Sequence, residues 1–385
     1  MHSQTRSIIA ALVLTTGSTL GADMYTVTDL GTLGDAVGAS GISDSGISVG
    51  YALDPMYRYH GFINDDGDFQ QITSMMSMNA QAQMMGINDL DMPILASYML
   101  GMLQTNASIP MMGAMMVIGE MMPCAINDTM TVVGSRYVTA PSGLREELAC
   151  RWDMGTITNL PSLNGATSSI AKGINDAGWV VGSSITSGSI TPTATLWMNN
   201  AAFDLGSLGG DMSQAIAINE NNTAVGISET PSGDTHAFRA AINTNGQVTE
   251  RVDLGSLPGG YSIAISINDL DQIVGSSSNR AVLWENDTLI DLNTRIAPSS
   301  GWILNKATGI NESGRIVGVG SLGGDPFRAF LLTPADCNAD LNNDGTLDFF
   351  DISELLSGQI DFNADTVFDF FDISAFLQAF QAGCP

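Results

Sequence analysis

One phrase recurs seven times along the chain and constrains its fold more than any other feature. Each copy has an apolar residue, Ile-Asn or a close variant, a short polar turn, and then an apolar-Val-Gly strand start. The copies begin at residues 41, 86, 125, 173, 217, 266 and 309, so the intervals between them run from 39 to 49 residues. A period of this length is typical of propeller blades and related arrays.

The phrase itself predicts a β-hairpin. Asn127, Asn175 and Asn268 each precede a polar run, where an Asn side chain can bond the backbone of the turn. The apolar-Val-Gly segment that follows has strand character, and its Gly indicates a bulge or a close approach of two strands.

A second pair of strands is predicted between successive copies. It is clearest in residues 150–160, 195–206 and 282–292, where one repeated position holds Trp152, Trp197 and Trp284. We interpret these Trp residues as packing in the blades. Two hairpins per period give four strands, which is the content of one propeller blade.

The ends of the array indicate how it closes. Full repeats finish with Asp-Leu-Gly-Ser-Leu, at 204–208 and 253–257, whereas the last repeat stops at 328–334 without that phrase. The phrase stands instead near the start of the chain, at 29–34. An N-terminal strand is therefore expected to complete the last blade and remove an exposed sheet edge. We predict an all-β fold, a seven-bladed β-propeller of about 45-residue repeats over residues 23–334; an open β-array is the alternative.

These repeats resemble the HAF-type extracellular repeats, named for a His-Ala-Phe phrase that stands here at His236-Ala237-Phe238. Variants of the phrase occupy 60–62 and 328–330, and the resemblance covers roughly residues 25 to 333. It implies a propeller-like fold and an extracellular setting, and it implies no defined activity.

The N-terminus has the pattern of an export signal. Residues 1–6 carry one positive charge, residues 8–14 form an apolar run too short to span a bilayer, and 15–22 are small residues suited to cleavage. We predict a signal peptide over 1–22 and a secreted protein without a transmembrane segment after its removal. The net charge of −27 disfavours nucleic acid and anionic membranes as partners.

Two segments near the C-terminus, 340–351 and 361–372, fit the twelve-residue calcium-binding loop. Each runs into an apolar segment expected to form a short helix. The predicted ligands of the first loop are Asp340, Asn342, Asp344, Thr346, Asp348 and Asp351, and those of the second are Asp361, Asn363, Asp365, Val367, Asp369 and Asp372. We predict two Ca²⁺ sites, the second weaker, because Thr366 replaces the turn glycine Gly345 and a left-handed backbone there costs about 1–2 kcal/mol.

This duplicated loop resembles dockerins, and more narrowly the dockerin-like module that ends in Gly-Cys-Pro in planctomycete secreted proteins, as at 383–385 here. The resemblance implies a small helical calcium module over 335–385 and a cohesin-like or other cell-surface anchoring partner. Dockerins commonly face their partner with loop positions 10 and 11, which are Phe349, Phe350, Phe370 and Phe371 here. Four Phe residues could form an apolar docking face, or one ring of each pair could fill the module's core.

Four cysteines suit an oxidising compartment and permit three pairings. We favour Cys124 with Cys150 and Cys337 with Cys384, because each pair then lies within one structural unit. The second pair would clasp the ends of a module whose core is small.

The remaining sequence gives little sign of catalysis. No serine or cysteine has a recognisable base beside it, and His60 and His236 occupy matching repeat positions, which favours a structural role. We therefore expect a secreted, non-enzymatic propeller platform with a calcium-dependent anchoring module. The alternative is a dockerin-bearing carbohydrate-active enzyme that acts on polysaccharide through two carboxylates converging at the propeller mouth.

Residues 75–122 hold 14 of the 21 methionines. Soft thioethers could bind Cu(I) in an oxidising compartment, whereas methionine more often fills irregular apolar gaps. We favour packing over copper binding.

Overall fold

The computed structural model describes residues 25–32, 36–72, 80–99, 105–111, 114–140, 142–186, 188–286, 288–335, 341, 349–358, 360–362 and 367–382. The chain divides into two compact units, Tyr25–Pro334 and a second that includes Ala335–Pro385.

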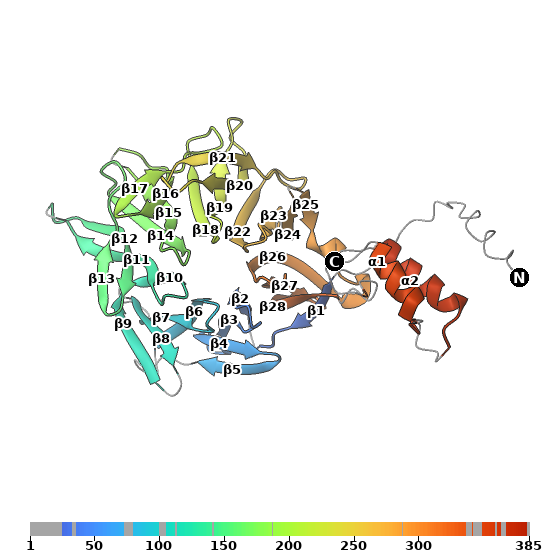
Figure 1. Ribbon diagram of the computed structural model, residues 1–385. Helices are drawn as coiled ribbons and strands as arrows, with labels where there is room; N and C mark the ends of the chain where they lie inside the picture. Colours follow the sequence, from blue (N-terminus) through green and yellow to red (C-terminus); the bar gives the residue numbers. More distant parts are fainter. Residues whose placement is uncertain are drawn as a thin grey trace, which may run out of the picture. The chain divides into compact units, whose positions relative to one another are not determined.

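Residues Tyr25–Pro334 form seven four-stranded antiparallel sheets arranged in a ring (Figure 1). This confirms the predicted all-β, seven-bladed propeller. Blades 1 to 3 comprise β2 (Val37–Ile42), β3 (Ser48–Leu53), β4 (Tyr59–Asp65) and β5 (Asp68–Ile72); β6 (Ala80–Ile87), β7 (Pro93–Met99), β8 (Thr105–Met111) and β9 (Ala114–Glu120); and β10 (Met122–Ile126), β11 (Val132–Thr139), β12 (Arg145–Asp153) and β13 (Thr156–Asn159). Blades 4 to 6 comprise β14 (Ser168–Ile174), β15 (Val180–Ile185), β16 (Thr193–Met198) and β17 (Ala201–Asp204); β18 (Ser213–Ile218), β19 (Thr223–Glu229), β20 (Thr235–Ile242) and β21 (Val248–Asp253); and β22 (Ser262–Ile267), β23 (Ile273–Ser277), β24 (Arg280–Glu285) and β25 (Thr288–Asp291).

Blade 7 is assembled from both ends of the array. Its strands β26 (Trp302–Ile310), β27 (Ile316–Leu322) and β28 (Asp325–Pro334) come from the last repeat, and its outermost strand is β1 (Tyr25–Asp29). β1 pairs antiparallel with β28, from Tyr25 opposite Pro334 to Asp29 opposite Phe330. The expected N-terminal closing strand is therefore confirmed.

The glycine of the repeated phrase permits a close approach between the first and second strands of a blade. The first strand of blade 5 shifts register between Ala215 and Ala217, opposite Gly226. A Cβ atom added at Gly226 would lie 2.0 Å from the carbonyl oxygen of Gln214. In blade 2 the position equivalent to Gly226 is occupied by the buried Leu95 instead of a glycine. The predicted bulge and close approach are thus confirmed.

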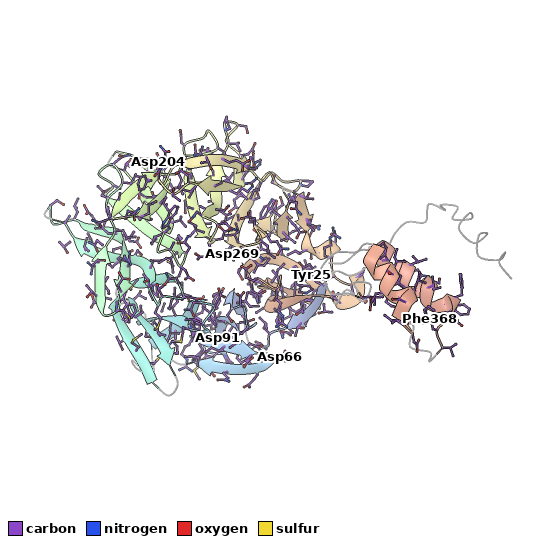
Figure 2. All side chains as sticks on the ribbon, viewed as in Figure 1. Tyr25, Asp66, Asp91, Asp204, Asp269 and Phe368 are labelled. Atoms are coloured by element: carbon purple, nitrogen blue, oxygen red, sulfur yellow. The ribbon has the colours of Figure 1, made fainter. Side chains whose placement is uncertain are left out.

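The repeated tryptophans lie on the third strand of their blades and are 1–3% exposed. Trp284 packs with Leu254 and Val225 of the preceding blade, and its Nε1–H donates to the carbonyl of Leu254 at 2.9 Å. Their predicted packing role is confirmed. Figure 2 shows the side chains that the propeller strands carry.

The second unit contains two helices, α1 (Phe349–Gly358) and α2 (Phe370–Ala382). Leu355 and Phe376 are buried between them, and Phe362 and Phe380 lie with ring centroids 5.4 and 5.6 Å from that of Phe376.

In the propeller, two 3₁₀ turns, η1 (Leu292–Thr294) and η2 (Pro298–Ser300), precede β26. None of the helices that the structure describes is long and apolar enough to cross a membrane.

Candidate functional site

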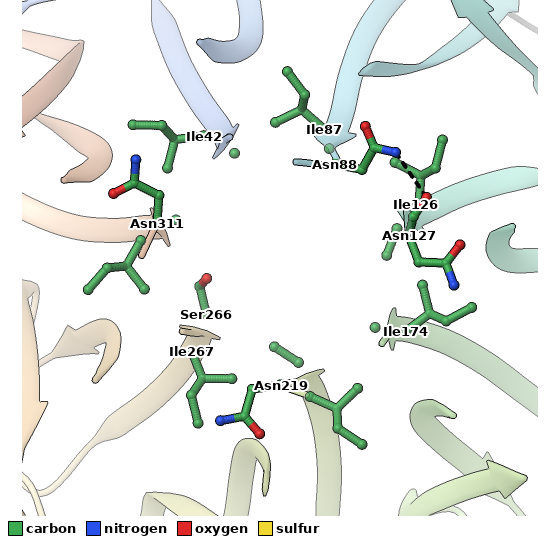
Figure 3. A pocket seen from close by; sticks show the side chains of 18 of the residues that line it. Ile42, Ile87, Asn88, Ile126, Asn127, Ile174, Asn219, Ser266, Ile267 and Asn311 are labelled. Atoms are coloured by element: carbon green, nitrogen blue, oxygen red, sulfur yellow. Dashed lines mark hydrogen bonds between the residues drawn. The ribbon is translucent and has the colours of Figure 1, made fainter. Parts of the chain in front are cut away.

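The first strands of the seven blades surround a central cavity of about 690 Å³ (Figure 3). Its lining comes from the ends of these strands and from the turns of the repeated phrase. The repeat that sets the fold therefore also sets the chemistry of the cavity mouth.

An asparagine ring ties the blades together at this mouth. It consists of Asn88, Asn127, Asn175, Asn219, Asn268 and Asn311, all 2–5% exposed. Each side-chain amide nitrogen donates to the backbone carbonyl of the matching residue in the next blade, with N···O distances of 2.9–3.2 Å. Each Oδ1 also accepts the backbone N–H four residues later, at 2.7–2.9 Å.

The asparagines therefore do more than shape turns. Asn311 donates across the ring closure to the carbonyl of Ser43, which takes the asparagine position in blade 1. The side chain of Ser43 has no amide group, and its Oγ donates instead to Oδ1 of Asp91 in the next blade, at 2.6 Å. The sequence predicted the turn bonds, but the bonds between blades were missed.

A carboxylate ring lies next to the asparagine ring, because the following residue is acidic in all seven repeats. Its members are Asp44, Asp89, Asp128, Asp176, Glu220, Asp269 and Glu312. Each carboxylate accepts the backbone N–H of its counterpart in the preceding blade, at 2.6–3.1 Å, and Asp44 accepts from Glu312 across the closure. Seven like charges thus surround one mouth of the cavity.

Burial and mutual repulsion raise pKa values in the carboxylate ring. The pKa of Asp89 is raised to about 6, mainly by burial and then by the charge of Asp44. Burial also raises the pKa of Asp128, Glu220 and Glu312, with smaller contributions from neighbouring ring carboxylates. These four carboxylates therefore hold protons at a higher pH than isolated carboxylates do.

The ring does not converge on a point. In the described part of the chain, no three His, Cys, Asp or Glu side chains come close enough to hold a metal ion. The described residues that line the cavity include no aromatic ring on which a sugar could stack, and they include Lys172 and Lys306. Evenly spaced carboxylates engaged with backbone N–H groups favour a structural role for this mouth.

In the C-terminal unit, both helices begin at the tenth position of their predicted calcium loops, at Phe349 and Phe370. The side chain of Asp372 is fully buried, and its Oδ2 accepts the N–H of Asp369 at 2.7 Å. Asp369 Oδ1 in turn accepts the N–H of Phe371 at 2.7 Å, so the two carboxylates form a reciprocal cap on α2.

The other predicted ligands are placed as follows. Asp361 is half-buried, Val367 is exposed, and Asp351 belongs to α1. Seven predicted ligands lie outside the described residues: Asp340, Asn342, Asp344, Thr346, Asp348, Asn363 and Asp365. The donor set of the loops is oxygen throughout, and Ca²⁺ prefers six to eight oxygen ligands, so these residues fit that ion.

Phe370 and Phe371 are 73% and 65% exposed, with their ring centroids 6.2 Å apart. The interpretation that one ring of each Phe pair fills the module core is therefore wrong for this pair. The core is made by other residues, chiefly Leu355 and Phe376. Phe349 and Phe350 begin α1.

The predicted Cys124–Cys150 disulfide is wrong, because both cysteines are free. They lie on β10 and β12 with β11 between them, both beside Gly134. Two strand spacings amount to roughly 10 Å, well beyond the Cα separation of about 6 Å that a disulfide spans. Burial raises the pKa of the Cys150 thiol to about 12 and also raises that of Cys124. Cys337 and Cys384 lie outside the described residues.

The methionines of blades 2 and 3 lie among apolar side chains. Met121 is buried in a cluster with Ile94, Cys150 and Trp152, and Met85 and Met116 pack against it. This environment agrees with packing rather than with copper binding.

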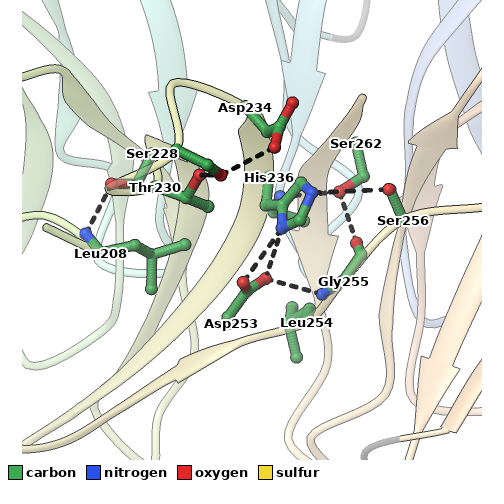
Figure 4. A network of polar contacts seen from close by, with 12 residues as sticks. Leu208, Ser228, Thr230, Asp234, His236, Asp253, Leu254, Gly255, Ser256 and Ser262 are labelled. Carbon is green, nitrogen blue, oxygen red and sulfur yellow. Dashed lines mark hydrogen bonds and ion pairs between the residues drawn. The ribbon is translucent and has the colours of Figure 1, made fainter. Parts of the chain in front are cut away.

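The two histidines outside the predicted signal peptide each contact an aspartate. His60 Nε2 lies 3.1 Å from Asp54 Oδ2, and His236 Nδ1 lies 2.9 Å from Asp253 Oδ1. The Oγ of Ser256 lies 3.5 Å from Nε2 of His236 (Figure 4). The expectation that no serine has a base beside it is therefore wrong at one place.

Comparisons with known proteins agree on the fold alone. No family model and no curated protein matches the chain. Similar solved structures include TolB from Acinetobacter baumannii (TM-score 0.42, 13% identity, 76% of this chain and 65% of that one) and YCF48 bound to D1 peptide (0.49, 9%, 84% and 100%). A third is the β-propeller domain of the Trilobed protease from Pyrococcus furiosus (0.46, 10%, 81% and 94%). The chain spans 65% of TolB and about half of a puromycin-hydrolyzing peptidase from Mycobacterium tuberculosis.

Proposed function

We propose that this chain is a secreted propeller platform that is anchored through a C-terminal, calcium-dependent module of the dockerin type. The observation that carries the proposal is the duplication in the C-terminal unit. Helices α1 and α2 begin at Phe349 and Phe370, at the same position of two calcium-loop sequences that are 21 residues apart. Independent acidic turns would have no reason to share that register.

The environment of the second loop supports a bound cation. Asp372 is a fully buried carboxylate, and Asp361 and Asp369 are partly buried. Buried negative charge is costly unless it is compensated. A bound Ca²⁺ would supply two positive charges to these oxygens, and the chain's own part is to present them at the start of α2.

The proposed docking face consists of the Phe pairs that begin the two helices. The exposed rings of Phe370 and Phe371 form a contiguous apolar surface on the described part of this module. An apolar surface suits a partner that offers an apolar groove, such as a cohesin-like anchoring protein. Because the helices begin within the calcium loops, loss of the ion should disorder this face.

The propeller's cavity mouth supports the platform role over a polysaccharide-cleaving enzyme. The carboxylate ring is spread evenly around the ring of blades, and each member already accepts a backbone hydrogen bond. A glycosidase needs two carboxylates flanking one bond.

Calorimetry of the full-length protein with Ca²⁺, after removal of bound ions by a chelator, tests the module. We expect two binding events of unequal affinity. Asp340→Asn should remove the tighter one and Asp361→Asn the weaker one, since each takes a charged ligand from a single loop. Asp269→Asn, in the carboxylate ring, is the matched control and should leave both events unchanged.

Two outcomes would overturn the proposal. One is the absence of Ca²⁺ binding, and the other is binding that depends on Asp269 and is unaffected by the loop variants. A Ca²⁺-dependent gain in hydrophobic-dye binding that is lost in Phe370→Ser/Phe371→Ser would locate the docking face separately.

A further inference from the structure

One arrangement recurs at the outer edge of blades 5, 6 and 7. A basic residue on the third strand contacts the aspartate that ends the fourth strand of the same blade. The pairs are His236 with Asp253, Arg280 with Asp291 and Arg328 with Asp29. The strand register is the same in each case, because the residue two positions after the basic one pairs with that aspartate. A serine or threonine stands three residues after each aspartate in the sequence, and these are Ser256, Thr294 and Thr32.

This shared geometry has a structural use, since it joins a strand to the loop leaving the blade. Either His or Arg can make this structural contact. Only His can also act as a base, because a guanidinium stays charged and cannot accept a proton, whereas an imidazole can. Within the described residues, only blade 5 combines such a base with the aspartate and the hydroxyl.

The hydrogen bonds of blade 5 set the tautomer of the histidine. Nδ1 of His236 lies 2.9 and 3.0 Å from the two oxygens of Asp253, and a carboxylate only accepts. In the neutral imidazole, Nδ1 therefore carries the proton and Nε2 is an acceptor. The Oγ of Ser256 lies 3.5 Å from that nitrogen (Figure 4). Asp253 is fixed by a further bond from the N–H of Gly255 at 2.8 Å.

We propose that Ser256, His236 and Asp253 form a hydrolytic triad that cleaves small carboxylic esters. Its order of contacts is that of a nucleophile, a base and a group that orients the base. This activity goes beyond the platform and anchoring roles and does not depend on calcium. The strands alternate in direction, so the triad lies on the propeller face opposite the carboxylate ring.

The reaction balances with water as the only co-reactant. Oγ of Ser256 attacks the ester carbonyl carbon and passes its proton to Nε2 of His236. The bond to the alcohol oxygen breaks, and that oxygen takes the proton from Nε2. Water then attacks the acyl-serine, His236 again accepts and returns a proton, and the carboxylic acid leaves.

The surroundings indicate the class of ester. The backbone N–H of Ser256 has no partner in the part of the chain that the structure describes, so it can donate to the developing oxyanion. The N–H groups of Gly255 and Leu257 are already used, by Asp253 and by Ser277 Oγ. A single oxyanion donor at a partly exposed site suits short acyl groups with good leaving alcohols rather than amides.

The test is covalent labelling of the full-length protein with a fluorophosphonate, followed by peptide mass mapping, together with hydrolysis of p-nitrophenyl acetate. We expect an adduct on Ser256. Ser256→Ala should abolish the adduct and lower hydrolysis by at least about 100-fold. Ser207→Ala is the matched control, because Ser207 occupies the same phrase in blade 4, where Thr193 stands in place of the histidine.

His236→Arg distinguishes a catalytic triad from a purely structural contact between His236 and Asp253. It recreates the Arg–Asp pair of blades 6 and 7, so the melting temperature should be retained while labelling and hydrolysis are lost. His60→Gln controls for general imidazole catalysis and should leave both readouts unchanged. The proposal is overturned if wild-type protein gives no adduct on Ser256, or if His236→Arg labels and hydrolyses as wild type does.

Discussion

At the scale of single residues, Asp89 is the carboxylate whose protonation should matter most. Its pKa is raised from 3.8 to about 6 in the folded protein, so the folded state binds a proton more tightly than the unfolded state between those values. The contribution of Asp89 to stability therefore falls as pH rises from about 4 to 6, and the full penalty remains at pH 7. Asp89→Asn keeps an oxygen for the N–H of Asp44 and removes the charge.

We expect Asp89→Asn to melt about 2 °C higher than wild type at pH 7. The ionised carboxylate should destabilise the folded protein by on the order of 1 kcal/mol, because solvent screens part of the repulsion. The difference should shrink as the pH falls from 6 to 4 and vanish below the unfolded pKa of 3.8, where Asp89 is protonated in both the folded and the unfolded state. Scanning calorimetry at low pH and at pH 7 measures this difference. Asp211→Asn is the control, because Asp211 is an exposed carboxylate outside the ring. A variant less stable than wild type at pH 7 would show that the charge is compensated.

At the scale of elements, the hairpin depends on the glycine that ends the repeated phrase. A Cβ on Gly226 would meet the carbonyl oxygen of Gln214 at 2.0 Å, so Gly226→Ala must push the first strand of blade 5 away. We expect a loss of about 1–3 kcal/mol in the free energy of unfolding, measured by urea denaturation. Gly86→Ala is the control, since its nearest neighbours would be at 3.6 and 4.0 Å. Equal stability of the two variants would contradict the close approach.

The repeat predicted these elements well because its information is local. The turn asparagine, the strand start and the glycine all lie within ten residues, and the misplaced Asp-Leu-Gly phrase at 29–34 predicted the closing strand. Contacts between repeats carry no such signal. The amide of Asn219 meets the carbonyl of Asn268, 49 residues on, and Ser256 meets His236 only because one loop returns beside the third strand. The cysteine pairing was wrong for a related reason, since two residues in one blade can still be separated by a strand.

At the scale of the whole molecule, the last blade is completed by β1, which brings five residues to the edge of blade 7. The N–H of Leu30 donates to the carbonyl of Ala329 at 3.0 Å. Antiparallel ladders alternate, so the N–H of Thr28 should also point to β28 and that of Val27 away from it. Thr28→Pro therefore removes a closing hydrogen bond, whereas Val27→Pro places the ring of proline on the open edge, where it is tolerated.

We expect Thr28→Pro to lower the melting temperature by roughly 3–6 °C and Val27→Pro to lower it much less. Hydrogen exchange should then separate local fraying from ring opening. β2 of blade 1 packs against β27 and β28, so a ring that opens at this seam exposes β2 as well. Faster exchange in both β28 and β2 of Thr28→Pro, but not of Val27→Pro, would establish that the N-terminal strand holds the seven blades closed. Faster exchange confined to β1 and β28 would mean that blade packing alone maintains the ring.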